Sequence, residues 1–516
     1  MASTTADVLA ARYGSSYRWL LTLTAMLGNI SLILSSTIVN VAIPNIMGAF
    51  GVGQDKAQWL SAGFLASMTV AMLLNSWMIA AIGKRNTYYV SMAVFVVGSV
   101  MAIISTSFDM LVFARLLQGA GAGFIHPLAL QVIYQIFPPD QRGRAMGFFG
   151  FGIVLAPALG PAFGGILVDA FDWRAVFWLV LPFCGIGSIM AAIFMPPRET
   201  DVTPPTMDWT GLVLVSIVMF SLLSGLSNGS REGWGSDTII IYFAVAAVSL
   251  IGFIAWESFT AEPMLNLKLF SNLRFASGCV LSFIWGAGNF GLWYLIPLFV
   301  QIVMGFTPTK AGFLLMPAGL LLALVFPLTG RISDWISPRI PIVIGLTMTS
   351  FSCFLMAGAD TNTAFWVFVW WLIIGRVGLG CVFPPLTTGS MRALPPEQVS
   401  QGAGMMSFSR QLGGAFGVSL LATFVDLRTV HYAESYIATQ TSGNSATMEY
   451  LRTLQTYLGQ AGTPEALQMP AALQQLGNAI FSQATMLGFR EGFLISALVF
   501  FAAIIPGSFL VKRKTD

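Results

Sequence analysis

Charged side chains are scarce in this chain of 516 residues: Asp, Glu, Lys and Arg make up 9% of it, against about 25% in soluble domains. Hydrophobic residues make up 56%. A water-soluble fold cannot cover so much apolar surface with so few polar side chains, whereas a lipid bilayer can. The net charge is only +3 and the basic residues are scattered, which argues against binding of nucleic acid. The composition therefore predicts an integral membrane protein.

Side chains that commonly carry catalysis or bind metals are also few. The chain has only two histidines, His126 and His431, and four cysteines, which all lie in apolar stretches without CxxC spacing. Cysteines in such surroundings are typical of small buried hydrophobic residues rather than of metal ligands or disulfides. No Gly-rich phosphate loop follows a predicted strand. We therefore expect no cofactor, no metal site and no enzymatic activity.

The long apolar runs predict fourteen membrane spans, because a span needs about 20 mostly apolar residues. Residues 1–16 are mixed and polar without the pattern of a cleavable signal, so the first run is expected to remain as a span. The predicted spans are 19–42, 58–82, 88–106, 110–134, 145–168, 175–195, 210–228, 238–256, 274–301, 310–330, 341–358, 364–388, 403–424 and 488–511.

Lys and Arg in the connections orient these spans, since cytoplasmic loops carry an excess of them. Fifteen lie in one set of loops and both tails: Arg12, Arg18, Lys84, Arg85, Arg142, Arg144, Arg198, Lys268, Arg274, Arg331, Arg339, Arg392, Lys512, Arg513 and Lys514. Seven lie in the other set: Lys56, Arg174, Arg231, Lys310, Arg428, Arg452 and Arg490. Both termini are therefore expected in the cytoplasm.

The same orientation places the long connection 426–490 outside the cytoplasm. It is polar and rich in Gln, and two amphipathic helices are expected near 446–458 and 464–483. Two interpretations stay open: a solvated lid, or a docking surface for a partner.

An internal repeat relates the two parts of the chain. Gly160–Gly164 aligns with Gly413–Gly417 at an offset of 253 residues (413 minus 160), and Ser76–Arg85 aligns with Gly330–Arg339 at an offset of 254. The aligned spans cross the membrane in the same direction. Parallel six-helix halves with a substrate site between them are a transporter architecture.

Four short motifs resemble those of the EmrB/QacA-type drug exporters, the fourteen-helix drug:H+ antiporter (DHA2) branch of the major facilitator superfamily. They are Ser36–Pro44 (STIVNVAIP), Arg115–Gly123 (RLLQGAGAG), Ala156–Gly165 (APALGPAFGG) and Ser409–Gly414 (SRQLGG). The third is similar to the family's antiporter motif and is the most specific of the four.

The resemblance implies an all-α major facilitator fold that exports small amphipathic molecules across a bacterial inner (cytoplasmic) membrane, by alternating access coupled to protons. It implies a six-helix half over 1–200, two inserted helices over 201–265 and a second half over 266–516. A periplasmic adaptor protein is a further expected partner. The alternative is export of a specific endogenous metabolite or of a lipid-like or siderophore-like anion, with weak or no proton coupling.

The predicted fifth span carries the residues expected at the moving interface. Its glycines form a small face that allows close helix approach, and its prolines kink the helix by removing backbone hydrogen bonds. These hinge residues are Gly152, Pro157, Gly160, Pro161, Gly164 and Gly165.

A cytoplasmic gate is expected from the resemblance. In the family, charge pairing between a loop and a helix end clamps this gate. The second half offers Asp334 and Arg339, whereas the first half keeps Gly83, Lys84 and Arg85 but has Ala80 in place of the usual Asp. If a clamp is present, the second half therefore supplies its acid.

Polar residues inside spans are costly and are candidates for substrate contact. Several are equally compatible with hydrogen bonding between helices, and the aromatic Trp285, Trp293 and Tyr294 around Asn289 suggest a wall for an apolar substrate. The cavity candidates are Asn29, Ser35, Thr37, Asn40, Arg115, Gln118, Trp285, Asn289 and Arg410.

The relatives place an Asp, a proton-carrier candidate, where this chain has Ser35, and no acid lies near the middle of a span. Arg115, Arg376 and Arg410 thus enter the membrane without an obvious carboxylate partner. Backbone carbonyls and water are one compensation; the other is an anionic group of the substrate at Arg115, oriented by Gln118. The second hypothesis predicts anionic or neutral cargo, with proton coupling weak, absent or moved to His126.

The sequence favours an efflux transporter over a membrane enzyme, for which no site is found. It also favours a transporter over a receptor or channel, because a parallel repeat with kinked helices implies alternating access.

Because of the charge bias, a single cysteine introduced at Asn444 should react with an impermeant maleimide on intact cells. Labelling only after lysis would contradict the predicted orientation.

Overall fold

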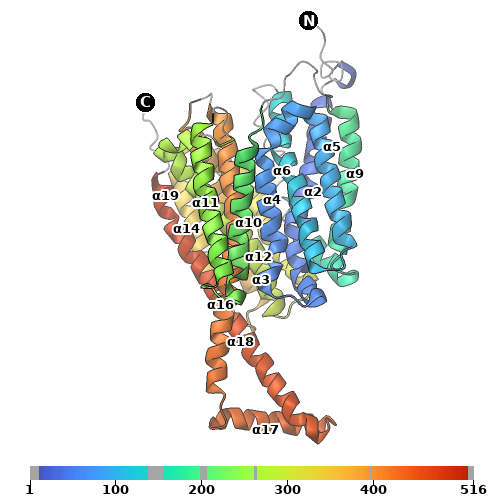
Figure 1. The fold of residues 1–516 in the computed structure, drawn as a ribbon, viewed down its shortest axis with the longest axis vertical. Coiled ribbons are helices and arrows are strands. Elements are labelled where there is room, and N and C mark those ends of the chain that lie inside the picture. Colours follow the sequence, from blue (N-terminus) through green and yellow to red (C-terminus); the bar gives the residue numbers. More distant parts are fainter. Residues whose placement is uncertain are drawn as a thin grey trace.

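The computed structural model describes residues 11–509, apart from residue 15 and the segments 138–154, 157–158, 198–205, 261–263, 266 and 396–397. The described part is helical and forms a bundle of long helices with a smaller projection at one end (Figure 1). In chain order its helices are α2 Ser16–Phe50, α3 Gln54–Ala57, α4 Trp59–Leu73, α5 Asn75–Ile103, α6 Phe108–Ile136, α8 Ala175–Trp178, α9 Val180–Phe194, α10 Trp209–Glu232, α11 Asp237–Phe259, η1 Leu267–Ser271, α12 Leu273–Ile302, α13 Pro308–Trp335, α14 Arg339–Met356, α15 Phe365–Met391, α16 Val399–Thr439, α17 Ser445–Gln460, α18 Glu465–Ala502 and α19 Ile504–Phe509.

Twelve of the described helices are long and apolar enough to cross a membrane. The second predicted span, 58–82, corresponds to α4 and the part of α5 before Gly83. At Gly83 the backbone has a φ of 81°, a conformation that glycine adopts at little cost, and this residue breaks α5 where a loop was expected. The fifth predicted span lies partly outside the described residues; its second part is the helix Leu159–Ala170. A count of fourteen is compatible with this arrangement.

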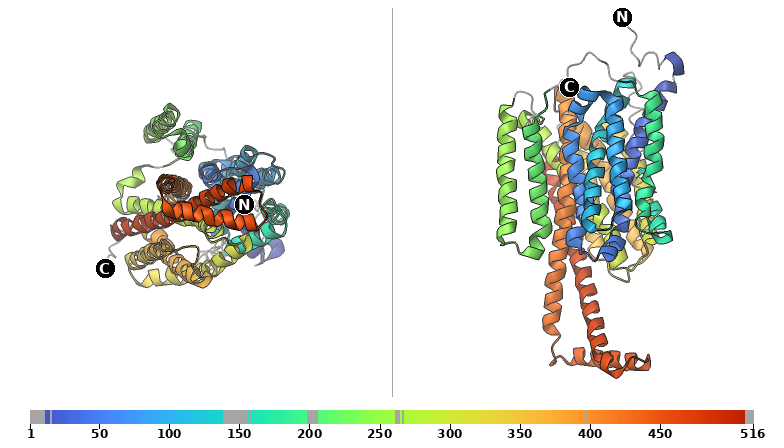
Figure 2. Two further views of the ribbon diagram at one scale, coloured as in Figure 1. Left: turned by 90° about the horizontal axis from the view of Figure 1, so that it is seen from below. Right: turned by 45° about the vertical axis from the view of Figure 1, so that its right-hand side comes forward.

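The expected connection 426–490 is largely helix rather than loop, and we call these residues the projection. Helix α16 has 41 residues and α18 has 38, so both continue beyond the roughly 20 residues that a bilayer requires. Helix α17 joins them as the third side of a triangle (Figures 1 and 2). The two amphipathic helices expected from the sequence are thus confirmed, the second as the first part of α18.

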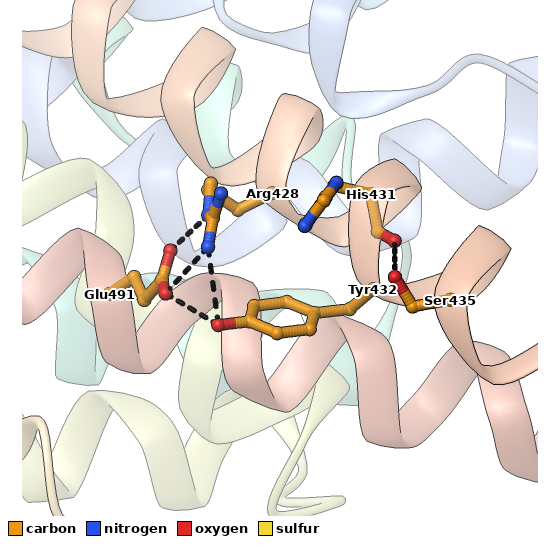
Figure 3. A network of polar contacts seen from close by, with 5 residues as sticks. All are labelled: Arg428, His431, Tyr432, Ser435 and Glu491. Carbon is orange, nitrogen blue, oxygen red and sulfur yellow. Dashed lines mark hydrogen bonds and ion pairs between the residues drawn. The ribbon is translucent and has the colours of Figure 1, made fainter.

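A cluster of three side chains joins α16 to α18 at the base of the projection (Figure 3). The Arg428 guanidinium binds Glu491 through two nitrogens: Nε donates to Oε2, and Nη2 donates to Oε1 at 2.9 Å. The Tyr432 hydroxyl donates to Glu491 Oε1 at 2.5 Å and accepts from Arg428 Nη2 at 3.3 Å. Two-pronged pairing of arginine with a carboxylate fixes geometry as well as distance, so the cluster fixes the angle at which the projection leaves the bundle.

Within the bundle, α6 and α15 have similar surroundings. Helix α6 packs against α4 and α5, and α15 packs against α13 and α14. Glycines permit the close approach in both places: a Cβ on Gly121 would meet the Ser91 carbonyl oxygen of α5, and one on Gly378 would meet that of Gly345 in α14.

Helices α10 and α11 lie at the edge of the bundle, where Figure 2 shows them as a separate pair. Their contacts with the remainder include two hydrogen bonds: Ser227 Oγ donates to the Asp55 carbonyl at 2.6 Å, and Thr423 Oγ1 donates to the Leu226 carbonyl at 3.0 Å. Both bonds lie toward the projection end of α10. These helices are therefore attached to the bundle from outside.

The Arg428 cluster predicts how firmly the projection is held. Replacing Arg428 with Gln removes the ion pair with Glu491, whose two side chains are about a third exposed, so the loss is about 1 kcal/mol. Backbone amides near 425–435 and 484–492 should therefore exchange hydrogen about fivefold faster. Hydrogen exchange with mass spectrometry measures this. Arg452→Gln, which removes the same charge from an exposed position of α17, is the control. Equal exchange in both variants would contradict the assigned role.

Candidate functional site

The side chain of Arg115 is fully buried where α6 meets α2 and α4. Its Nη1 donates to Ser35 Oγ at 3.0 Å and to Gln118 Oε1 at 2.7 Å. Its Nε donates to the Leu60 carbonyl at 2.8 Å, and its guanidinium carbon lies 4.3 Å from the centre of the Phe64 ring. Neutral oxygens and an aromatic face thus surround this cation, and in the described part of the chain it forms no ion pair.

Gln118 extends the cluster toward α5, because its Nε2 donates to Ser99 Oγ at 2.8 Å. The predicted pairing of Arg115 with Gln118 on one helix face is therefore present. The two residues join three neighbouring helices instead of facing an open space.

Arg376 has a similar environment in α15. Its Nη1 donates to Asn289 Oδ1 of α12 at 2.9 Å, and its guanidinium carbon lies 4.0 Å from the centre of the Trp293 ring. Trp293 and Tyr294 are almost fully buried. Trp285 is buried as well, so all three aromatic residues proposed as a wall pack inside the protein.

Arg410 of α16 differs from both. Its side chain is partly exposed, and its guanidinium carbon lies 5.1 Å from the centre of the Phe383 ring. Among the residues that the structure describes, it has no hydrogen-bond acceptor and no carboxylate partner. The Phe383 ring lies 4.9 Å from that of Trp285, whose Nε1 donates to the Leu379 carbonyl at 3.2 Å.

His126 of α6 lies near Arg410 but belongs to the other part of the bundle. Its Nδ1 is 3.0 Å from Asn29 Oδ1 of α2, and the positive charge of Arg410 acts on the ring. Asn29 thus orients the candidate proton carrier, and Arg410 and His126 are brought together from helices α16 and α6.

Asn40 connects α2 to α12. Its Nδ2 donates to the Trp293 carbonyl at 3.1 Å, and its Oδ1 accepts from Ser61 Oγ at 2.6 Å. Nearby, Gln301 Nε2 donates to the Val41 carbonyl at 3.0 Å. The bonds of Asn40 to Trp293 and of Gln301 to Val41 join the first and second parts of the chain, and both lie in the parts of α2 and α12 toward the projection.

The helix Leu159–Ala170 adds a second contact of this kind. A Cβ on Gly165 would meet the Pro308 carbonyl oxygen at the start of α13, and one on Gly312 would meet the Pro161 carbonyl oxygen. Asp169 Oδ2 also accepts from the Thr309 amide at 2.8 Å. The two parts of the chain are therefore closed against each other at the projection end.

Gly160 and Gly164 face α2 from the same helix. A Cβ on Gly160 would lie 3.0 Å from Thr37 Oγ1, and one on Gly164 would meet the side chain of Ile38 and lie 3.2 Å from its carbonyl oxygen. The Thr37 hydroxyl donates to carbonyls of its own helix. Gly152 and Pro157, predicted in the same hinge, lie outside the described residues.

The predicted gate residues lie at the end of the bundle opposite the projection. Lys84 and Arg85 follow the break at Gly83, Asp334 lies in the last turn of α13, and Arg339 begins α14. The side chain of Asp334 is outside the described set, so its pairing remains a prediction.

Four polar side chains in these contacts were not identified from the sequence: Ser61, Ser99, Asp169 and Gln301. Serines are frequent in membrane helices and carry no distinctive signal. Asp169 lies directly after the glycine-rich motif, and its position at a predicted helix end was the signal available.

A bundle of membrane-spanning helices, closed at one end and built around buried arginines, defines a polytopic membrane transporter. Residues 25–418 match the Major Facilitator Superfamily, and the chain belongs to this superfamily.

Its similar proteins include multidrug export protein EmrB of Escherichia coli, 29% identical over 80% of this chain and 82% of that protein. Lincomycin resistance protein LmrB of Listeria monocytogenes is 28% identical over 78% of this chain and 85% of that protein. The resemblance to EmrB-type exporters predicted from the motifs is thus confirmed.

Among solved structures, the chain is similar to a bacterial homolog of the human lysosomal transporter Spinster, in an inward-facing and unoccupied conformation. The TM-score is 0.66 and the identity 16%, and the match covers 96% of this chain and 98% of that one. At this identity the likeness shows the fold.

The glycine contacts generate a prediction. Leu in place of Gly164 must displace Ile38 and separate α2 from its neighbour, so transport should fall at least tenfold while insertion is retained. Gly160→Ala should have a milder effect, because small shifts of the Leu34 and Thr37 side chains accommodate a methyl group. Gly185→Leu is the control, since open space surrounds that position. Transport in proteoliposomes is the measurement; full activity of well-inserted Gly164→Leu protein would contradict the assignment.

Proposed function

We propose that this protein is a secondary active exporter of small amphipathic molecules that works by alternating access. The observation that carries the proposal is the closure of the bundle at one end by a few contacts between its first and second parts. The names of the relatives, a multidrug export protein and a lincomycin resistance protein, support export as the direction and amphipathic compounds as the cargo.

The contacts at the closed end are suited to repeated breaking. The hydrogen bonds from Asn40 to Trp293, from Gln301 to Val41 and from Thr309 to Asp169 each contribute about 0.5–1.5 kcal/mol net, or somewhat more where a carboxylate accepts. The glycine surfaces between them have no side chains that interlock. When the first and second parts of the chain rock against each other, these contacts break and others form at the opposite end. The net change in free energy is then small.

The proposed moving bodies are residues 1–200 and 266–516, with the inserted helices in 201–265. The peripheral place of α10 and α11 supports this division, because neither lies between the two bodies. The proposed location is a bacterial inner membrane, with the termini in the cytoplasm and the projection outside. The basic bias of the loops supports this orientation, as does the position of α19 at the end of the bundle opposite α17.

The proposal includes coupling of export to the movement of protons. Ser35 stands where the relatives have a candidate proton carrier, and here it accepts a hydrogen bond from Arg115. His126, paired with Asn29, is the candidate that replaces it. The alternative function, export of a specific endogenous anion with weak or no proton coupling, is favoured by the absence of a carboxylate beside the three arginines among the described residues.

The projection is proposed as the docking surface for a periplasmic adaptor. A simple lid has no need for large apolar side chains in water, yet Tyr457 is 66% exposed and Phe481 is 60% exposed. Leu467 and Leu473 are exposed on the same helix as Phe481. A rigid helical triangle with exposed apolar residues fits a protein partner better than a solvated loop does.

Counterflow tests the proposed function. Proteoliposomes preloaded with unlabelled lincomycin or another exported amphiphile should transiently accumulate the labelled compound above its equilibrium level, because a carrier exchanges substrate whereas a channel only equilibrates it. Empty liposomes and Gly164→Leu protein are the controls. Equilibration without overshoot would indicate a channel. An imposed pH gradient that leaves the initial rate unchanged would argue against proton coupling.

A further inference from the structure

The three arginines inside the bundle differ in what their guanidinium groups bind. Arg115 donates to three neutral oxygens, and Arg376 donates to Asn289, each beside an aromatic ring. Arg410 has a ring beside it but no acceptor in the described part of the protein. It is also partly exposed, whereas the other two are almost fully buried. The Nη2 atoms of Arg115 and Arg376 also lack a partner, but both are buried. Arg410 is thus the intramembrane cation that a ligand can reach.

Arg410 is held inside the bundle by close packing of its own backbone. A Cβ on Gly286 of α12 would meet the Arg410 carbonyl oxygen. The following residue, Gln411, contacts the Met68 sulfur of α4 through Nε2 at 3.8 Å, which joins the second part of the chain to the first. The backbone of Arg410 is therefore fixed by close packing near the interface between the first and second parts of the chain.

Aromatic rings from three further helices surround this position. Phe383 of α15 lies beneath the guanidinium and has its ring centre 5.5 Å from that of Phe326 of α13 and 4.9 Å from that of Trp285 of α12. Phe383 and Phe326 are both partly exposed. The rings form a continuous apolar surface next to the unpaired charge.

The opposite side of the interface does not neutralise Arg410. His126 and Asn29 come from the first part of the chain, and His126 lies within electrostatic reach of Arg410. Neither residue supplies a negative charge. An unpaired guanidinium in a membrane helix is costly, so an anion that enters this space recovers part of that cost.

We propose that Arg410 binds the anionic group of an exported organic anion, while Phe383, Phe326 and Trp285 hold its aromatic or apolar body. This inference rests on the proposed function and makes it more specific. A guanidinium presents parallel donors that match the two oxygens of a carboxylate, which favours organic carboxylates as the ligand class. From the sequence, Arg115 was expected to pair with the anionic group of the substrate. We assign this role to Arg410 instead, because Arg115 uses its donors to bind neighbouring helices.

Binding of three probes with the same aromatic body tests the proposal. The probes are 1-naphthylacetate, its neutral amide 1-naphthylacetamide and the cation 1-naphthylmethylammonium. Affinities are measured on purified full-length protein in nanodiscs, with empty nanodiscs subtracted for partition into lipid. Wild-type protein should bind naphthylacetate at least tenfold more tightly than the amide, and the cation least tightly.

The variants separate charge from packing. Arg410→Gln should weaken naphthylacetate at least tenfold and leave the amide within about twofold, which also shows that the variant is folded. Arg410→Lys should retain an intermediate affinity for the anion, because it keeps the charge but loses the paired donors. Arg274→Gln removes the same charge from an exposed position at the start of α12 and should change nothing.

Three results would overturn the proposal: equal binding of anion and amide by wild type, including no binding of either; an unchanged anion affinity in Arg410→Gln; or an equal loss of anion and amide in that variant. Counterflow of other amphiphiles by wild-type protein would then leave the proposed export function standing. Loss of counterflow for every amphiphile, with anion binding at Arg410 intact, would reject the transport function while leaving the site.

Discussion

A charged side chain inside a bilayer must find its polar partners within the protein, and this constraint governs the centre of the bundle. Arg115 and Arg376 meet most of it with carbonyl, hydroxyl and amide oxygens from neighbouring helices, together with the face of an aromatic ring, although Nη2 of each has no partner among the described residues. Each arginine thereby ties its own helix to others at a fixed rotation. The helices that carry these residues, α6 and α15, have similar surroundings, so the same solution serves both parts of the chain.

Because the arginine clusters are rigid, movement must occur elsewhere. Helices α4 and α16 pack against each other across the first and second parts of the chain, with Gln411 against Met68. At the projection end the contacts between the two parts are of a different kind: single hydrogen bonds and glycine surfaces, as where Gly165 faces Pro308 and Gly312 faces Pro161. Such contacts hold two bodies together without interlocking them. Rigid packing within each body and weak, smooth contact between bodies are what alternating access requires. Arg410, which is free of the clusters, lies near that moving interface.

Two helices of the bundle, α16 and α18, continue into the projection. Helices α16 and α18 continue out of the bundle without a break, so the composition of their exposed surfaces changes along a single rigid element. The pairing of Arg428 with Glu491, supported by Tyr432, fixes the two helices where they leave the bundle (Figure 3).

The composition alone determined that this chain is a membrane protein, because a water-soluble fold cannot cover so much apolar surface whereas a lipid bilayer can. The charge breaks predicted most of the spans, although the second is divided between α4 and α5, and the motifs around Arg115 and Gly160 predicted the family. Only the tertiary structure decided which arginine is available, because Leu60, Ser35 and Asn289 reach their partners from helices far away in sequence. Likewise, the sequence near Asp426 does not show that the chain continues as helix beyond the predicted span, whereas the structure shows α16 packed against α18 there.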